Sequence, residues 1–329
     1  MSKKTRGRRP GSVDPAQADA SGTSDGPNPK QACPCGSGKR YKACHGSGDD
    51  GVIVLRPFEG LACEPDVIAV REFVPSAVAE LPLSAAGKKL AGDKLPLLVS
   101  VLPGAAAAMV RGDGAVFVGL QTQVRTGDIS GDLARALRWA LDAGPAEVLP
   151  VSGSSLGDGG VRLQDLLDPD AALELTVYQD FSWWLPEGEQ TAEVQAAVQQ
   201  ANTVIKPTEQ VTADGVRGAY WVDAGEKAHL RWVRPEPEAK LIAALARLQA
   251  ADKLDLGTGS RYVGSFRAHG LLVPVWDLDR EMHVKEWSEP VAAFEVELGK
   301  ALASFESEPM TDRERRSRDA LAGRQVTLR

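Results

Sequence analysis

Four side chains near the N-terminus, Cys33, Cys35, Cys44 and His45, have the types and the spacing of metal ligands. Cys33 and Cys35 supply two thiolates from one tight turn. The adjacent pair Cys44 and His45 adds a thiolate and an imidazole further along the chain. Clustered cysteines in a chain without a secretory signal favour a metal site over disulfides. The sequence therefore predicts a site for Zn2+.

A Cys3His set fills the tetrahedral coordination of zinc and leaves no open position. The predicted ion is therefore structural and not a Lewis acid. Gly36 and Gly38 let backbone amides turn toward the thiolates and reduce their negative charge. The predicted zinc knuckle, residues 31–48, is too short to have a core of its own. Metal binding would supply most of its folding free energy, on the order of 10 kcal/mol.

Residues 33–46, CPCGSGKRYKACHG, resemble the SEC-C motif, the zinc element at the C-terminus of the SecA preprotein translocase ATPase. The resemblance matches its four ligands to Cys33, Cys35, Cys44 and His45. It implies contact with the export chaperone SecB, with ribosomes and with anionic lipid. The helicase motifs of SecA are absent from the sequence, so translocase ATPase activity is not implied. The remainder of the chain resembles an uncharacterised actinobacterial family.

Residues 153–157, GSSLG, match the G-x-S-x-G pattern of a hydrolase nucleophile turn. Such a turn requires a helix after the serine, but the glycine-rich stretch 157–160 follows here. A Gly/Ser loop is the better interpretation. An enzyme around Ser155 or His269 is kept as an alternative.

The histidines of the body, His229, His269 and His283, have no metal-ligand spacing. We predict hydrogen-bonded or surface roles for them. His269, together with nearby arginines and Tyr262, is the best candidate for a polar pocket. Asp277 and Asp279 resemble a D-x-D metal pair, but turn and capping roles are the simpler explanation, because the segment ends a strand beside a helix.

The formal net charge of −7 is unevenly distributed. Residues 1–48 carry +6 and residues 311–329 carry +3, so the body between them carries −16. Short basic ends attract phosphate backbones and an acidic body does not, so RNA contact is expected only at the two ends. The alternative, that these ends are simply solvated, is open.

The elements that would position these residues suggest an α+β fold in five segments: a low-complexity tail at 1–30, the knuckle at 31–48, one unit at 51–205, a second unit at 206–306, and a basic C-terminal helix or tail at 307–329. Each unit is predicted as strand, strand, helix, strand, strand, helix, so that the body is two tandem ββαββα units. Hairpins are predicted at 105–123 and 218–233.

The longest apolar run, residues 95–110, contains two prolines and a glycine. It predicts two buried strands around a turn instead of a membrane helix. The N-terminus lacks the apolar region of a secretory signal, so cytoplasm is the expected location.

These observations favour a cytoplasmic adaptor over an enzyme. The zinc knuckle would dock on a protein partner, such as a SecB-like export chaperone or the ribosome. The first alternative is an RNA- or ribosome-associated factor that binds through its basic ends, and the second is a hydrolase-like enzyme in the body. The sequence leaves the oligomeric state and the ligand of the body open.

Overall fold

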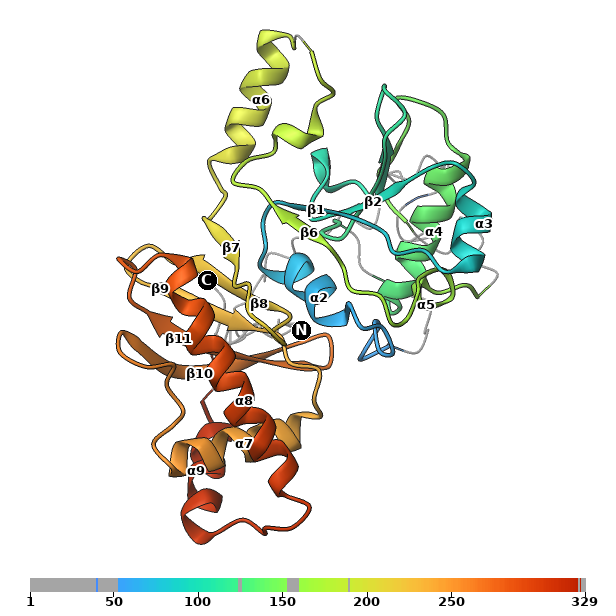
Figure 1. Ribbon diagram of the computed structural model, residues 1–329. Helices are drawn as coiled ribbons and strands as arrows, with labels where there is room; N and C mark the ends of the chain where they lie inside the picture. The colour runs from blue at the N-terminus through green and yellow to red at the C-terminus, as the bar shows by residue number, and fades with distance from the viewer. Residues whose placement is uncertain are drawn as a thin grey trace, which may run out of the picture.

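The computed structural model describes residue 40 and residues 53–123, 126–152, 160–188, 190–324 and 326. These residues form helices and two β-sheets, which confirms the α+β class (Figure 1). The low-complexity tail and the zinc knuckle lie outside the described residues, except for the exposed Arg40.

The first sheet has six strands in the order β5-β3-β4-β2-β1-β6. Strands β2 and β4 are parallel, and the other pairs are antiparallel. The strands are β1 (Ala77–Glu80), β2 (Pro96–Val99), β3 (Ala108–Val110), β4 (Val116–Gly119), β5 (Val148–Leu149) and β6 (Leu175–Val177). The apolar run at 95–110 thus forms β2 and β3 around a turn, as predicted.

Three helices accompany the first sheet: α3 (Ala85–Ala91), α4 (Ile129–Asp142) and α5 (Leu163–Leu166). Helix α4 buries Leu133, Leu137 and Leu141, the stripe that its i, i+4, i+8 spacing predicts. Its buried face contributes to the same apolar core as β3 and β4. A fourth helix, α6 (Ala192–Asn202), extends away from the sheets at the top of Figure 1, and Val198 is its one buried residue.

The second sheet has five antiparallel strands in the order β10-β11-β9-β8-β7. They are β7 (Thr208–Gln210), β8 (Ala219–Asp223), β9 (Ala228–Trp232), β10 (Ser260–Ala268) and β11 (Leu271–Leu278). The β8–β9 hairpin turns at Gly225, as predicted, where φ is +98°.

Both faces of the second sheet are covered. Helices α7 (Glu238–Ala250) and α8 (Ser288–Ser304) pack with Trp232 and Trp276 on one face. Helix α2 (Glu64–Glu72) covers part of the opposite face and lies between the two sheets (Figure 1). Successive strand side chains point to opposite faces, so neighbours such as Tyr220 and Ala219 belong to different cores.

The core around α2 is shared by the two predicted units. Phe73, at the end of α2, packs edge-on against Tyr220 and Phe266, with ring centroids 6.0 and 6.2 Å apart. The Tyr220 hydroxyl donates to Asp66 at 2.8 Å. The segments on either side of the predicted boundary at 205/206 therefore pack against each other through buried surface.

The two units differ in strand pairing. From β8 to α8 the element order is the predicted ββαββα. In the first unit, α2, β1, α3 and β2 precede the predicted hairpin, which is formed by β3 and β4, and β6 pairs with β1. In the second unit, the corresponding strands β10 and β11 pair with each other. The prediction of two tandem ββαββα units is therefore not confirmed, because the first unit has additional elements and a different strand pairing.

The C-terminal helix α9 (Asp312–Ala322) begins at the predicted cap Thr311 and packs on α7. Leu321 is buried in the second core, and Arg247 of α7 donates to Glu314 at 2.9 Å. The one large apolar side chain of α9 and its partly buried ion pair therefore attach this polar helix to the body.

A short segment after α9 pairs with the edge strand β10. The Ser265 amide donates to the Arg324 carbonyl at 3.2 Å, and the Val326 amide donates to the Ser265 carbonyl at 3.0 Å. Gly264 has φ +146°, and a Cβ there would lie 2.8 Å from the Arg324 carbonyl oxygen. A glycine is therefore required where the segment approaches the strand.

No helix in the part of the chain that the structure describes is both long enough and apolar enough to cross a membrane.

Candidate functional site

The predicted zinc ligands Cys33, Cys35, Cys44 and His45 lie outside the described residues. Within the described ranges, no group of three or more His, Cys, Asp or Glu side chains is arranged to hold a metal ion. The fourth cysteine, Cys63, is buried directly before α2. Burial raises the pKa of its thiol to about 11, so it is protonated at neutral pH.

The G-x-S-x-G stretch, residues 153–157, also lies outside the described residues. Strand β5 ends before it at Leu149, and the next described helix, α5, begins after it at Leu163. Ser155 stays a candidate from the sequence alone.

The three body histidines lie in three different settings. His269 Nε2 lies 2.7 Å from Glu72 Oε1 and against the ring of Phe58, at the contact between the units. His283 caps the 3-10 helix η4 (Val284–Trp287), and its Nδ1 accepts from the Lys285 amide. His229 faces Asp277 on β11. The structure therefore does not bring these histidines together.

The prediction of a polar pocket that His269 shares with the nearby arginines and Tyr262 is wrong, because these side chains lie elsewhere. Arg267 pairs with Glu238, and its Nη2 lies 2.5 Å from Glu238 Oε1. Tyr262 and Arg261 instead line a different cavity at the start of β10. These residues are near His269 in the sequence, but β10 extends away from the turn at His269 and separates them along its length.

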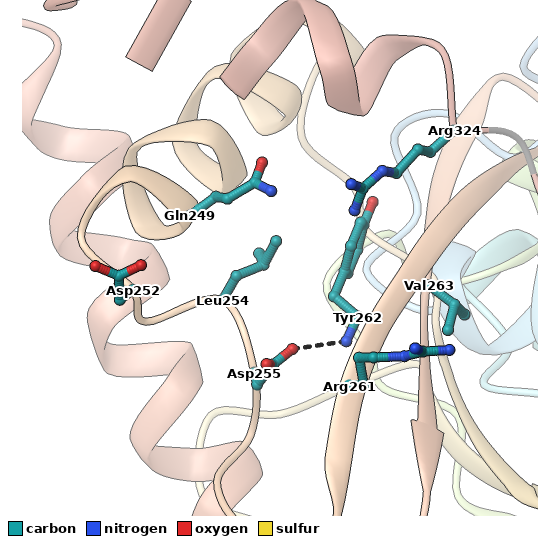
Figure 2. A pocket seen from close by; sticks show the side chains of 8 residues that line it. All are labelled: Gln249, Asp252, Leu254, Asp255, Arg261, Tyr262, Val263 and Arg324. Carbon is teal, nitrogen blue, oxygen red and sulfur yellow. Dashed lines mark hydrogen bonds between the residues drawn. The ribbon is translucent and has the colours of Figure 1, made fainter. Parts of the chain in front are cut away.

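That cavity has a volume of about 680 Å3 and lies between the end of α7, the start of β10 and the segment after α9 (Figure 2). The Arg324 guanidinium points toward the Tyr262 hydroxyl, and the Gln249 amide projects into the space beside them. Asp255 accepts from the Tyr262 amide at 2.7 Å. Burial raises the pKa of Tyr262, so its hydroxyl is a donor at neutral pH.

A second cavity, of about 460 Å3, lies at the neighbouring end of the second sheet and shares Arg261 with the first. The predicted pair Asp277 and Asp279 lies here, but the two side chains have separate roles. Asp277 forms ion pairs with Lys227 and Arg261. Asp279 accepts from the Glu281 amide at 3.0 Å and fixes the turn after β11, as the turn interpretation predicted.

Sequence reasoning missed a row of basic side chains on β9. Lys227 precedes the strand, and His229 and Arg231 follow on the same face, with apolar residues between them. The alternation was visible in the predicted hairpin at 218–233. The sequence did not show that this face of β9 would be covered, because a strand that is covered on both faces is expected to have apolar residues on both.

The chain is therefore an α+β protein with two β-sheets, in which a short motif of zinc-binding type precedes the body in the sequence. The chain belongs to the family of unknown function DUF5926, which matches residues 57–329. The SEC-C motif matches residues 30–47, which confirms the resemblance drawn from the ligand spacing. Neither a curated protein nor a solved structure matches the chain.

Proposed function

We propose that this chain is a non-enzymatic zinc-binding adaptor of the cytoplasm. Its SEC-C knuckle docks on a protein or ribosomal partner of preprotein export or translation, while the body is available for a second contact. The observation that carries the proposal is the SEC-C match at residues 30–47, which includes a complete set of four ligands.

In this proposal Cys33, Cys35, Cys44 and His45 hold one Zn2+. The ion supplies structural cross-linking, because four protein ligands leave no position for a substrate. The segment between the two ligand pairs contains Lys39, Arg40 and Lys42. Held by the metal, this basic segment would present its charges to an acidic partner or to a phosphate backbone.

The surroundings of the candidate catalytic residues support a binding role over an enzymatic one. His269 and Glu72 hold the contact between the two units, and Asp279 fixes a turn. Each of these groups has a structural task that accounts for its position without a reaction.

Metal content tests the zinc assignment. Elemental analysis of the purified full chain is expected to give one zinc per chain, and Cys33→Ser/Cys35→Ser is expected to lose it. The matched control is Cys63→Ala, which removes a buried cysteine of the body and should keep the full zinc content. Metal-free wild-type protein that was purified without chelator would contradict the assignment.

Affinity capture from a lysate tests docking, with the wild type and Cys33→Ser/Cys35→Ser compared side by side. Loss of specific partners, ribosomal proteins included, from the variant is expected. Identical partners would contradict docking through the knuckle. Capture that disappears steeply with salt and with deletion of residues 1–12 would instead favour the RNA-binding alternative.

A further inference from the structure

Arg231 lies on β9 where the second sheet faces α2. Its Cα partners are Tyr220 on β8 and Val275 on β11. The residue is 6% exposed, and its guanidinium carbon lies 5.6 Å from the ring centroid of Phe73, at the end of α2. A cation is therefore enclosed at the contact between the two units.

No carboxylate of the described residues forms an ion pair with this cation, and its Nε atom is buried without an acceptor. Burial lowers the pKa of Arg231 to about 10, so the side chain is still charged at neutral pH. An enclosed charge is unfavourable unless an anion compensates it. The cation–π contact with Phe73 compensates only part of this cost.

The nearby carboxylates already have partners. Asp66 accepts from the Tyr220 hydroxyl and from the Gly218 amide at 3.2 Å. Asp277 lies 3.4 Å from His229 Nε2 and also pairs with Lys227. Neither is placed to neutralise Arg231.

The other arginines that are buried in the described body have an acceptor or an ion-pair partner within the fold, although the Nε atom of Arg71 is also buried without an acceptor. Arg234 pairs with Glu236 and Glu295, and Arg71 donates to the carbonyl of Leu120. The fold thus provides acceptors for its buried guanidinium groups elsewhere, and Arg231 is the exception.

The two residues that precede Arg231 on its face of the strand indicate an entry path. The side chain of Lys227 is 51% exposed and that of His229 is 23% exposed, so burial increases inward along the strand. Residues two apart on a strand are separated by about 7 Å on one face. Lys227 also lines the 460 Å3 cavity, which opens this end of the row to solvent.

We propose that Arg231 and His229 form the inner end of a binding site for a phosphate group, which enters past Lys227. A guanidinium offers paired N–H donors that match two phosphate oxygens. A phosphate dianion would compensate Arg231 and would favour the protonated form of His229, whose pKa burial and the nearby Arg231 lower in the ligand-free protein. Lys227 and Arg231 place two cations along this face in a body whose total charge is acidic.

Thermal unfolding of the full chain tests the site, with inorganic phosphate titrated and chloride used to keep the ionic strength constant. Phosphate is expected to raise the midpoint of wild-type unfolding in a saturable manner. Arg231→Met should lose this shift, while its ligand-free midpoint equals or exceeds that of the wild type. Arg231→Lys keeps the positive charge but lacks the paired N–H donors of a guanidinium, so it should bind phosphate at least about tenfold more weakly.

The matched control is Arg267→Met, which removes the same charge from an exposed ion pair on β10 and should keep the full phosphate shift. A wild-type midpoint that rises equally with chloride, or a phosphate shift retained in Arg231→Met, would overturn the proposal. A larger shift with acetate than with phosphate at equal ionic strength would also overturn it, because the site would then prefer a carboxylate.

Discussion

At the scale of single residues, Arg231 and Arg234 show how differently one short segment treats two buried cations. They are three positions apart and face opposite sides of the second sheet. Arg234 lies over the ring of Trp232, with its guanidinium carbon 4.7 Å from the ring centroid, between Glu236 and Glu295. Arg231 has only the ring of Phe73. Their substitutions should therefore have different effects on stability.

Arg234→Met is expected to lower the free energy of unfolding by about 3 kcal/mol, because two partly buried carboxylates lose their shared partner. Urea unfolding of the full chain measures the effect. Arg267→Met, which breaks an exposed pair, should cost less than about 1 kcal/mol. Equal losses in the two variants would show that burial of the Arg234 pair contributes nothing.

The buried carboxyl group of Asp66 predicts a pH dependence of the free energy of unfolding. Burial raises the pKa of Asp66 in the folded protein, although hydrogen bonds from Tyr220 and Gly218 oppose this shift. The folded state then binds a proton more tightly than the unfolded state, so this group's contribution to stability falls as pH rises through the folded pKa. Asp66→Asn should remove that fall while keeping an acceptor for Tyr220.

The measurement is the free energy of unfolding of Asp66→Asn and of the wild type from acidic to neutral pH. The difference between them should shift in favour of the variant as pH rises above the ordinary range of an aspartate. A difference that is constant across this range would contradict the raised pKa.

The zinc ligands could be predicted from the sequence because metal coordination depends on a few donors that are close together in the chain. That Arg231 is buried without a carboxylate partner could not be predicted. It depends on α2, which is more than 150 positions away in the sequence, and on which nearby carboxylates are already bound to other groups.

At the scale of elements, α9 is stabilised by its own cap and is attached to the body by two side chains, Leu321 and Glu314. Thr311 and Glu314 form a capping box, and Glu314 also accepts from Arg247. Thr311→Ala should lower the free energy of unfolding by about 1 kcal/mol, because an amide at the start of α9 loses its acceptor. Chemical denaturation measures this loss.

Ser307→Ala is a suitable comparison, since its exposed hydroxyl makes only a 3.4 Å contact with the Ser304 carbonyl. It should leave stability within about 0.5 kcal/mol of the wild type. If Thr311→Ala were equally neutral, α9 would not unfold together with the body.

Most hairpins and long helices could be predicted because their signals are local. A turn glycine such as Gly225 or an apolar stripe such as that of α4 is visible within one segment. Helix α2 had no such stripe. Eight of its nine residues are buried, including Glu64 and Asp66, so no polar face alternates with an apolar one.

At the scale of the whole molecule, one face of the second sheet is covered by α2, which belongs to the first unit. Tyr220, Val233 and Leu271 belong to the core that α2 completes. A fragment that begins at residue 206 would expose this face to water. It is expected to be insoluble or to bind a hydrophobic dye strongly, as sedimentation and dye fluorescence would show. A soluble, monomeric fragment without dye binding would contradict a shared core.

The sheet topology itself could not be predicted from the order of elements. Strands β1 and β6 are nearly a hundred residues apart and still pair, and β2 pairs directly with β4 although β3 comes between them in the sequence. Pairing over such distances depends on which faces are buried against one another, which element order does not specify.

The segment at Arg324–Val326 has one more consequence. It occupies the outer rim of β10, where an uncovered strand would present free amide and carbonyl groups to other molecules. A chain shortened before Arg324 would lose this shield, and its copies would tend to add to one another strand by strand. Truncations and fusions at this end therefore need to be checked for aggregation before any loss of activity is assigned to them.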